Sequence, residues 1–537
     1  MLTSACLDDL TTAGTATTGN TDASDYAGLF PVEQKNPSGV PGLQLDGYFD
    51  DTSTFNTEHG WFHDAQFVIR LPDKWNGKLV ITGAPGIRKQ YSVDPVIGDF
   101  VLAEGYAYAS TDKGNDGDLF YRDGATPGDA VAEWHQRVTE LTIATKQTIA
   151  AYYGRAPERT YITGISNGGY LTRWQIEHHP ELFDGGVDWE GTLMADTPNL
   201  FTYLPVALTN YPKYKANGDQ AAHDAMIKAG FAPGSEFLWD DHYGEYWDLT
   251  QRLYREEFDP DYDGPLEGGI PFCQSGTPMC DADYDWAKRP PAVHAAMAKV
   301  ALTGDIQKPL ITLHGTLDAL LPIATDSDVY QRMIEAAGKG ALHRYYVIEN
   351  GNHVDGRYDL YPDRIRPIQP CWHAAFDAMV AWVEHRTEPP PSQFVADKPH
   401  SADNVNACTL APAAAAHTVA GPGPLATPGQ PQVARTHGRL RVRSVRVRRG
   451  RLSVRGRVVL PKGVVARQAC GSGRVVVTVR RAGRKPHVRS APLRGNCTFR
   501  TTIRVGRERG VLRLATRFNG NRALFPARAR AAKVRVR

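Results

Sequence analysis

Short apolar runs alternate with longer helical stretches between about residues 40 and 190. Five runs have the hydrophobic pattern of strands, and they are LQLDGYF, AQFVIRLP, KLVITG, YAYAS and YITG. Among them, DFVLAEG predicts a short helix and residues 129–153 predict a long amphipathic helix. Strands and helices in this alternation predict an α/β fold with a largely parallel sheet.

The alternation stops after GGVDWEG and resumes near residue 308. It resumes with two apolar strands, KPLITLHG and HRYYVIEN, and a helical segment at about residues 329–337 separates them. The run CWHAAFDAMVAWVEHR then predicts a closing amphipathic helix. The interruption, at about residues 191–307, is crowded with Tyr, Trp, Asp and Pro, and we interpret it as an inserted cap or lid.

Composition marks the ends of this domain. Residues 1–29 are rich in Thr, Ala, Gly and Asp without apolar periodicity, which predicts a flexible lead-in to a main domain over residues 30–386. Residues 387–434 contain EPPPS, APAAAA and GPGPLATPGQP, a composition typical of a semi-extended linker. Apolar residues then alternate with Arg at period two, so residues 435–537 predict a small antiparallel β-sandwich with one arginine-covered face.

Charge divides the chain at the same place. The 537 residues carry a net charge of +2, but residues 435–537 hold 31 Lys and Arg against a single acidic residue, Glu508. The first 434 residues therefore hold 30 basic and 58 acidic side chains, a net charge of −28. This division indicates two modules with different surroundings or different tasks.

The 7 cysteines lack the paired spacing of a zinc site, so we expect disulfides. The expected pairs are Cys273 with Cys280 and Cys470 with Cys497, which leaves Cys6, Cys371 and Cys408 for one more bridge and one free thiol. Disulfides predict an oxidising, extracellular location. The first ten residues lack the pattern of a signal peptide, so we expect that such a signal has been removed from this chain.

The sharpest chemical signal is the motif GISNGG at residues 164–169, between the strand YITG and the helical run YLTRWQIEHH. A nucleophilic serine on a tight strand-to-helix turn needs small residues two before and two after it, here Gly164 and Gly168. The turn also places the N–H of Asn167 beside Ser166, where it can donate to an oxyanion. We interpret Ser166 as a nucleophile, and an ordinary glycine-rich turn is the alternative.

An acid and a base for Ser166 follow later in the chain. LHGTLD places Asp318 just past an apolar strand, and ENGNH places His353 after the last one. The order Ser, Asp, His is that of the α/β-hydrolase fold, in which His353 would take the serine proton and Asp318 would hold the imidazole. A helix-capping carboxylate and a surface histidine are the alternative interpretations of these two residues.

Three other residues compete for these roles. Asp188 follows the preceding strand and is the leading substitute acid. His314 lies too early at the end of its own strand, and His373 lies on a predicted helix. We expect both histidines to be structural.

The second oxyanion donor should come from the loop after KLVITG, where Pro85 has no N–H to give. The segment Ala84-Pro85-Gly86-Ile87 resembles the Pro-Gly-aromatic turn of the cutinase-like polyester hydrolases. That resemblance implies that Ile87 donates its amide, with Ile in place of the aromatic ring. A rigid turn without a catalytic part is the alternative.

The segment YITGISNGGYLTRWQIEHHPELFDGG, with HGTLDALLP and NGNH, resembles a branch of the α/β hydrolases. The branch is that of the secreted bacterial tannases, feruloyl esterases and polyhydroxyalkanoate-depolymerase-like enzymes, and the resemblance covers about residues 40–386. It implies an α/β-hydrolase fold with an inserted cap, and extracellular hydrolysis of aromatic or aliphatic esters.

These features predict a serine carboxylic-ester hydrolase that works through an acyl-enzyme on Ser166 and requires no cofactor. A serine peptidase or amidase is the first alternative, because the same three residues serve both reactions. A surface-binding protein with an inert hydrolase domain is an alternative of another class.

The cap carries eight aromatic rings suited either to lining a substrate cleft or to packing the cap onto its domain. They are Trp239, Tyr243, Tyr246, Trp247, Tyr254, Tyr262, Tyr284 and Trp286. Asp259, Asp261 and Asp263 are spaced as in calcium loops, but the twelfth position is Ile270, which excludes an EF-hand. A structural calcium site and a solvated acidic turn are the two interpretations of this segment.

The arginines of residues 435–537 suit contact with an anionic envelope, a polymer surface or the acidic module of the same chain. We do not expect nucleic acid as a partner, because no nucleic-acid motif or aromatic stacking platform accompanies the arginines. A membrane span is not expected either, because no apolar run reaches roughly 18 residues. The charge division predicts salt-sensitive attachment to anionic surfaces or docking within the chain.

Overall fold

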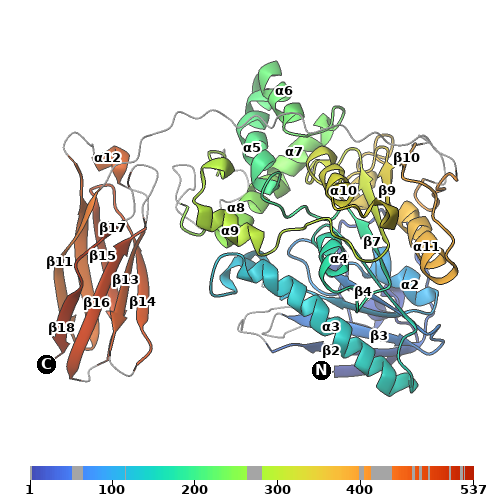
Figure 1. The fold of residues 1–537 in the computed structure, drawn as a ribbon, viewed down its shortest axis with the longest axis horizontal. Coiled ribbons are helices and arrows are strands. Elements are labelled where there is room, and N and C mark those ends of the chain that lie inside the picture. Colours follow the sequence, from blue (N-terminus) through green and yellow to red (C-terminus); the bar gives the residue numbers. More distant parts are fainter. Residues whose placement is uncertain are drawn as a thin grey trace. The chain divides into compact units, whose positions relative to one another are not determined.

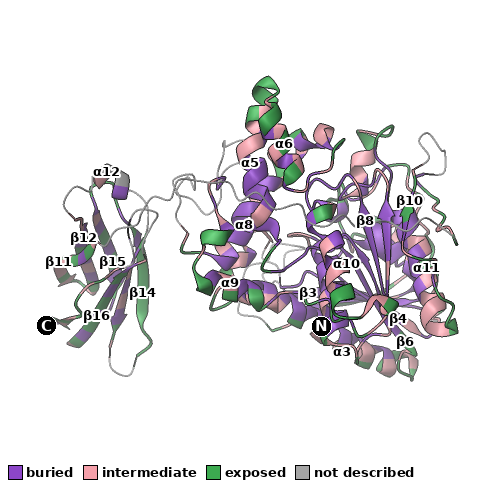
Figure 2. Cartoon of the chain, turned by 45° about the horizontal axis from the view of Figure 1, so that its top comes forward, coloured by how far each residue is buried: buried purple, intermediate pink, exposed green. Residues whose placement is uncertain are grey.

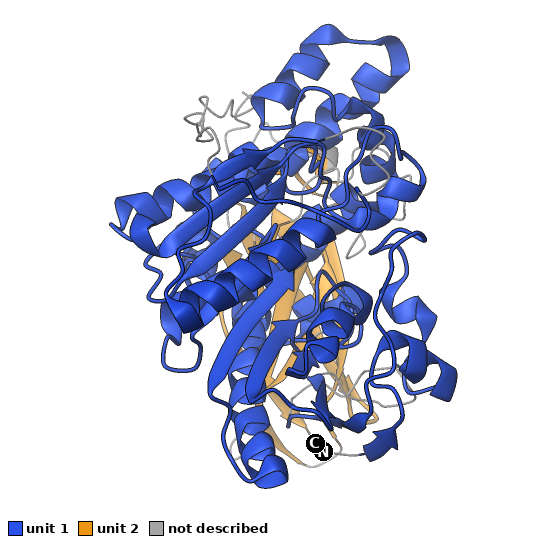
Figure 3. Cartoon of the chain, turned by 90° about the vertical axis from the view of Figure 1, so that its right-hand side faces the viewer, with its two compact units in different colours: residues 1–258, 285–427 blue, residues 259–284, 428–537 orange. Residues whose placement is uncertain are grey.

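The computed structural model of the protein describes twelve stretches of the chain, which are residues 3–50, 65–114, 117–262, 281–397, 404–412, 438–461, 466–470, 474–481, 484–506, 509–519, 524 and 527–536. The chain divides into two compact units, coloured separately in Figure 3. The first unit comprises residues 1–258 and 285–427, and the second comprises residues 259–284 and 428–537.

A ten-stranded mixed sheet is the centre of the first unit (Figure 1). In order across the sheet its strands are β1 (Thr3–Leu7), β2 (Gly42–Tyr48), β3 (Gln66–Pro72), β5 (Ala107–Thr111), β4 (Lys78–Gly83), β6 (Arg159–Ile165), β7 (Gly185–Trp189), β8 (Leu310–Gly315), β9 (His343–Ile348) and β10 (Gln393–Val395). The pairings from β1 to β5 are antiparallel, and those from β5 through β10 are parallel. The predicted α/β fold with a largely parallel sheet is confirmed.

Helices cover both faces of this sheet. They are α2 (Asp99–Ala103), α3 (Asp129–Tyr153), α4 (Asn167–His178), α10 (Ser327–Ala336) and α11 (Gln369–His385). Neighbouring residues of a strand point to opposite faces, and a Cβ on Gly185 would meet Met379 of α11 whereas one on Gly186 would meet Ile176 of α4. The central strands are buried on both sides, as their purple colour in Figure 2 shows.

The interruption of the α/β alternation is a helical insertion between β7 and β8, as predicted. It contains α5 (Leu200–Asn217), α6 (Gln220–Lys228), α7 (Trp239–His242), a π-helical turn (Tyr243–Trp247), α8 (Asp248–Phe258) and α9 (Pro291–Ala298). Five of its eight aromatic rings are buried and three are half-buried. Most of these rings therefore pack the insertion together. No described helix is both long enough and apolar enough to cross a bilayer.

The first residues form regular structure, which corrects the expectation of a flexible lead-in over residues 1–29. Strand β1 pairs with β2, and α1 (Thr12–Thr18) and a 3-10 turn (Ala23–Tyr26) follow. Leu10 is fully buried, and the backbone N–H of Thr12 donates to the carboxylate of Asp99 at 2.8 Å. Thr12 and Asp99 are 87 positions apart in the chain, so the local pattern of apolar residues does not reveal their contact.

The segment 387–434 is only partly a linker, which corrects a second expectation. Within it, β10 adds a strand to the sheet beside β9, and Cys408 forms a disulfide with Cys371 of α11. Strand β10 has three residues, which is too short to give an apolar pattern that stands out from a proline-rich segment. Its partner β9 is also distant in sequence. Residues 413–437 of the expected linker lie outside the described residues.

Two antiparallel sheets form the C-terminal part, as predicted. One contains β11 (Arg439–Arg448), β12 (Arg451–Val459) and β15 (Thr498–Arg504), and the other contains β13 (Arg474–Arg480), β14 (His487–Pro492), β16 (Gly510–Phe518), β17 (Ala527–Arg528) and β18 (Ala532–Val536). A short helix, α12 (Ala466–Ala469), precedes β13. Inward-facing apolar residues of both sheets form one core.

The disulfides of the described residues agree with the expected pairing. Cys470 is bonded to Cys497, and of the three remaining cysteines Cys371 and Cys408 form the further bridge. Cys6 is exposed and free. The expected pair of Cys273 and Cys280 lies outside the described residues.

Candidate active site

The register of the parallel strands brings the candidate residues to one edge of the sheet. Ile165 at the end of β6 pairs with Trp189 at the end of β7, and Trp189 pairs with Leu313 near the end of β8. The residues that follow these strands therefore emerge side by side. Ser166, Glu190, Asp318 and His353 all lie in such segments.

Ser166 stands on a strained turn between β6 and α4. Its φ of 59° is rare for a residue with a side chain, and such strain is typical of functional sites. A Cβ on Gly164 would lie 2.4 Å from the carbonyl carbon of Gly168, and a Cβ on Gly168 would lie 2.3 Å from the carbonyl oxygen of Gly83. Glycine at both positions lets α4 start this close to the sheet, as the motif predicts.

Three predicted side chains form one hydrogen-bonded chain. The Oγ of Ser166 lies 3.1 Å from Nε2 of His353, and Nδ1 of His353 lies 2.8 Å from Oδ2 of Asp318. All three residues are buried, with 7%, 5% and 1% of their surfaces exposed in that order. Burial in a medium of low dielectric constant strengthens these interactions relative to water.

The carboxylate of Asp318 is stabilised in its charged form. Its Oδ1 accepts from the backbone N–H groups of Leu320 and Leu321, both at 2.8 Å. Burial by itself raises the pKa of Asp318, but the charges and hydrogen bonds of His353 and His314 outweigh burial and lower that pKa. Asp318 is therefore an anion at neutral pH, suited to hold an imidazolium.

The competing residues have other partners. The carboxylate of Asp188 lies 2.6 Å from Nε of Arg173 and accepts from the N–H of Gly191, so it is engaged away from His353. His314 contacts the hydroxyl of Ser327 and the carbonyl of Leu321 through its two ring nitrogens, and its Nε2 also lies 3.4 Å from Oδ2 of Asp318, which it helps to hold. On α11, His373 stacks on Phe100 with ring centroids 4.0 Å apart.

The loop after β4 forms a tight turn beside the start of α4. The N–H of Arg88 donates to the carbonyl of Pro85 at 3.0 Å, and Gly86 within the turn has a φ of 49°. The carbonyl of Gly86 accepts from Nζ of Lys113 at 3.1 Å and from Nδ2 of Asn167 at 3.3 Å. This turn places the predicted donor Ile87 on a peptide whose carbonyl is held from two sides.

Asn167 also ties the inserted helices to the nucleophile turn. Its Oδ1 accepts from the hydroxyl of Tyr254 on α8 at 2.8 Å and from the hydroxyl of Thr192 at 3.0 Å. The indole N–H of Trp247 donates to the carbonyl of Ala319, next to Asp318, at 2.7 Å. The insertion therefore contacts the site at both ends of the hydrogen-bonded chain.

Glu190 is a residue of this site that the sequence analysis did not identify. It directly follows β7, is fully buried, and its Oε2 lies 3.7 Å from Nδ1 of His353. The sequence did contain a signal for Glu190. Like Asp318, it is an acidic residue shortly after an apolar strand of the sheet. Asp188, which was expected to follow the strand, lies within it instead.

Glu190, His314 and Asp318 are the one group of possible metal ligands that lies close together within the described ranges. Both nitrogens of His314 are engaged with protein oxygens, and Asp318 accepts two backbone amides and His353, so this group is a hydrogen-bonded network. Of the calcium candidates, Asp259 accepts from Tyr284, Asp261 accepts from Asn519, and Asp263 lies outside the described residues.

Two family models match separate parts of the chain. The model described as tannase and feruloyl esterase matches residues 52–197, and that of the 3HB-oligomer hydrolase matches residues 276–428. The first match contains Ser166 and the second contains Asp318 and His353.

Three similar proteins have curated names. A "probable feruloyl esterase" of Arthroderma benhamiae is 29% identical over 177 residues, which cover 30% of this chain and 31% of that protein. A mono(2-hydroxyethyl) terephthalate hydrolase of Piscinibacter sakaiensis is 26% identical, covering 24% of this chain and 23% of that protein. A D-(-)-3-hydroxybutyrate oligomer hydrolase of an Azoarcus species is 32% identical, covering 20% and 17% respectively.

The matched segments span less than a third of the length of each of these relatives. They agree with the two family models in pointing to the same group of proteins. The comparisons thus confirm the resemblance seen in the sequence and support an esterase of the tannase and feruloyl esterase branch of the α/β hydrolases.

Proposed function

We propose that this protein is a secreted serine carboxylic-ester hydrolase that acts through an acyl-enzyme. The observation that carries the proposal is the chain of contacts from Ser166 through His353 to Asp318, with distances of 3.1 Å and 2.8 Å. A hydroxyl, an imidazole and a carboxylate in this order are the parts that nucleophilic acyl transfer needs.

The first half of the reaction forms the acyl-enzyme. Oγ of Ser166 bonds to the ester carbonyl carbon while its proton passes to Nε2 of His353, and the imidazolium is stabilised by Asp318. The oxygen of the tetrahedral intermediate accepts from the N–H groups of Asn167 and Ile87. The bond to the alcohol then breaks, and the leaving alcohol takes the proton from His353.

The second half releases the acid. A water molecule gives a proton to Nε2 of His353 and attacks the acyl carbon, and the bond to Ser166 breaks as the proton returns to Oγ. The free carboxylic acid leaves and the enzyme regains its starting state. Every proton is accounted for by Ser166, His353, water and the alcohol, so the residues present suffice for the reaction.

Aromatic esters and polyester-type esters are the proposed substrates. The names of two similar proteins specify feruloyl and terephthalate groups, which are aromatic acids, and a third specifies an oligomer of hydroxybutyrate. The inserted helices place Tyr254 next to the site, where its hydroxyl contacts Asn167, and such a ring suits an aromatic acyl group.

An extracellular location fits the disulfides. Cys371–Cys408 and Cys470–Cys497 are both disulfide bridges, and such bridges persist in oxidising surroundings. Secretion is therefore part of the proposal.

The first prediction tests the role of Ser166. The purified full-length protein is assayed with phenolic, short-chain aliphatic and polymeric esters and treated with a fluorophosphonate probe. Ser166→Ala is expected to lower kcat/KM by a factor of about 10⁴ or more and to abolish labelling, because the attacking atom is lost. Ser4→Ala, at an exposed serine of β1, is the control and should keep both.

Other outcomes would redirect the assignment. Faster cleavage of an amide than of its matched ester would favour a peptidase or amidase. Absence of labelling in both the wild type and Ser166→Ala would favour an inert hydrolase domain on a binding protein. Equal labelling of both proteins would remove Ser166 from the mechanism.

A second part of the proposal concerns attachment through the arginine-rich sheets. Arg451 on β12 lies directly opposite Arg504 on β15 and Arg448 on β11, and Arg455 lies opposite Arg500. Like charges directly opposite each other destabilise a sheet, and a bound anion relieves that repulsion. The arrangement supports contact with an anionic polymer.

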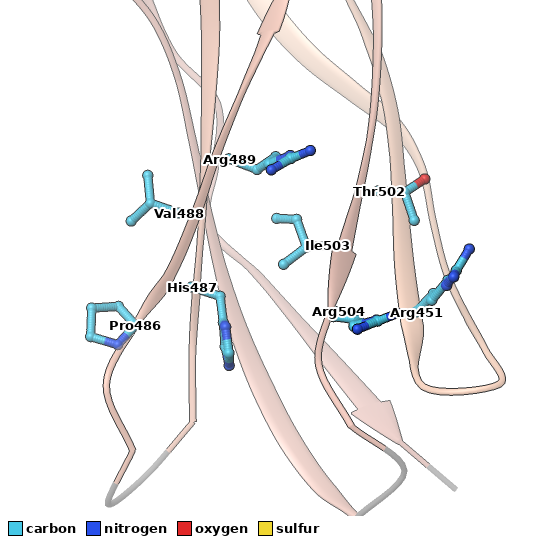
Figure 4. A pocket seen from close by; sticks show the side chains of 8 residues that line it. All are labelled: Arg451, Pro486, His487, Val488, Arg489, Thr502, Ile503 and Arg504. Atoms are coloured by element: carbon cyan, nitrogen blue, oxygen red, sulfur yellow. The ribbon is translucent and has the colours of Figure 1, made fainter. Parts of the chain in front are cut away.

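A groove of about 550 Å³ adjoins these charges (Figure 4). Its lining includes Arg451, Arg489, Arg504 and His487, all labelled in the figure. Arginine side chains bind carboxylate, sulfate or phosphate groups in pairs of hydrogen bonds, so a groove with several arginines fits a chain of anionic groups. The sole acidic residue of residues 435–537, Glu508, lies outside the described residues.

A further inference from the structure

The site contains a second carboxyl group that the mechanism above does not use. Glu190 is 0% exposed, and its Oε1 accepts from the N–H of Gly315 at 2.7 Å. Its Oε2 is buried without a hydrogen-bond partner and lies 3.7 Å from Nδ1 of His353. An unpartnered buried carboxyl oxygen is costly, so its place beside the imidazole requires an explanation.

The backbone holds Glu190 in this place. Its N–H donates to the carbonyl of Leu313 at 2.8 Å, and its φ is 49°, a conformation that is strained for a residue with a side chain. The side chain therefore points back along the ends of β7 and β8 to the same imidazole nitrogen that Asp318 contacts. Carboxyl oxygens of Glu190 and Asp318 lie within 4.8 Å of each other.

Two buried carboxyl groups this close to one imidazole do not both ionise readily. Asp318 is the more readily ionised of the two. It accepts hydrogen bonds from two backbone N–H groups and from His353, whereas Glu190 accepts from one backbone N–H group. Burial raises the pKa of Glu190 well above its ordinary value, and the charges of Asp318, Asp355 and Asp326 raise it further. Glu190 is thus the neutral member.

We propose that Glu190 and Asp318 form a carboxyl pair that shares one negative charge behind His353, with Glu190 as a positioning residue for the imidazole. In the wild type Asp318 carries the charge. When the carboxylate of Asp318 is removed, Glu190 loses its proton to solvent and accepts the hydrogen bond from Nδ1 of His353. This inference rests on the proposed esterase mechanism, since it concerns the partner of the same base.

The test uses three variants of the full-length protein, Glu190→Gln, Asp318→Ala and the double variant. Glu190→Gln is expected to lower kcat by about three- to tenfold, because the imidazole loses a neighbouring group while glutamine stays neutral and its Oε1 can still accept from Gly315. In Asp318→Ala, kcat is expected to fall by about 10- to 100-fold. Loss of a carboxylate that alone orients the histidine would lower kcat by roughly 10⁴-fold. The double variant is expected to show the full loss of roughly 10⁴-fold.

Two kinetic results would overturn the proposal. One is equal activity of Asp318→Ala and the double variant, because Glu190 would then not replace Asp318 as the partner of His353. The other is a loss of a hundredfold or more in Glu190→Gln alone, because the charged form would then act in the wild type.

A spectroscopic measurement tests the protonation of Glu190 without relying on activity or on the stability of Asp318→Ala. The infrared difference between the wild type and Glu190→Gln at neutral pH is expected to show the loss of one protonated carboxyl band. An unchanged protonated-carboxyl absorption would overturn the proposal. If the wild type hydrolyses no ester and Ser166 does not react with the fluorophosphonate, the proposed function fails while this spectrum still decides the state of Glu190.

Discussion

Backbone contact between α4 and the sheet is set by two glycines. A Cβ on Gly168 would lie 2.3 Å from the carbonyl oxygen of Gly83, and Gly83 immediately precedes the turn that carries Ile87. Gly83 therefore takes part in two distances. One is the distance from α4 to the sheet, and the other is the distance from Ser166 to the proposed oxyanion donor Ile87. Side chains could adjust to a small misfit here, but a backbone carbonyl cannot.

Gly168→Ala is accordingly expected to lower kcat of ester hydrolysis by about 100-fold or more, since a displacement of about 1 Å between reacting groups has that effect. The free energy of unfolding should fall by only about 1–3 kcal/mol, the usual cost of overpacking. Gly244→Ala is the matched control, because a Cβ on Gly244 has no atom within 4 Å. Activity of Gly168→Ala close to that of the control would show that α4 can shift without harm.

The inserted helices cap a helix of the main fold. Oε1 of Glu257, at the end of α8, accepts from the N–H groups of Ala130 and Val131 at the start of α3, at 3.0 Å and 3.3 Å. Burial raises the pKa of Glu257 to about 8, against the opposing effect of these N–H groups. An element far along the chain thus completes the first turn of α3 with a neutral carboxyl group.

This cap predicts a pH-dependent difference between the wild type and Glu257→Gln. Because the pKa of Glu257 is higher in the folded state, its contribution to stability is complete below pH 4.5 and is lost as the pH rises through about 8. Glutamine does not titrate, so the variant should gain stability relative to the wild type over this range, on the order of 5 kcal/mol at most. Urea unfolding at pH 5 and pH 8.5 measures this gain. A stability difference that is equal at both pH values would contradict the prediction.

Charge is the property that distinguishes the two parts of the chain at the scale of the whole molecule. Residues 435–537 carry 31 basic residues and one acidic residue, while the remainder has a net charge of −28. The structure adds that basic side chains face one another across strands in both C-terminal sheets, for example Arg451 with Arg504 and Arg480 with Arg513. These opposed like charges are the basis of the proposed attachment to anionic surfaces.

Retention of the full-length protein on carboxymethyl cellulose tests this attachment. The wild type is expected to bind at low salt and to elute as salt rises, because each contact between arginine and an anion releases counterions. A variant with Gln at Arg448, Arg451, Arg455, Arg500 and Arg504 should elute at clearly lower salt, with an unchanged or higher melting temperature. Elution of the wild type that does not depend on salt would refute the attachment.

The matched control removes the same number of charges from exposed positions of the first unit. These positions are Lys35, Arg155, Arg159, Lys215 and Lys288, each changed to Gln. If net charge alone governs retention, both variants will elute together. If the arginine rows form the contact, only the variant of the C-terminal sheets will elute early.

Local pattern was sufficient for much of the fold. The period of apolar residues predicted α3 at the bounds Asp129–Tyr153 and located the strands β4, β6, β8 and β9, because these elements bury one face or both and their composition shows it. Ser166, Asp318 and His353 were found for a related reason. Each lies at the end of an apolar strand, and the ends of neighbouring parallel strands share one edge of the sheet.

Contacts between distant residues were decided by the tertiary structure alone. Asp99 holds Thr12 across 87 positions, Cys408 is bonded to Cys371 across 37 positions, and Glu257 caps α3 across 127 positions. Glu190 likewise meets His353 only because β7 and β9 flank β8. The sequence by itself determined which segments become strands and helices and in what order their chemistry follows. Which carboxyl, imidazole and amide groups meet depends on sheet order and on the placement of the insertion, and neither leaves a periodic signal in the chain.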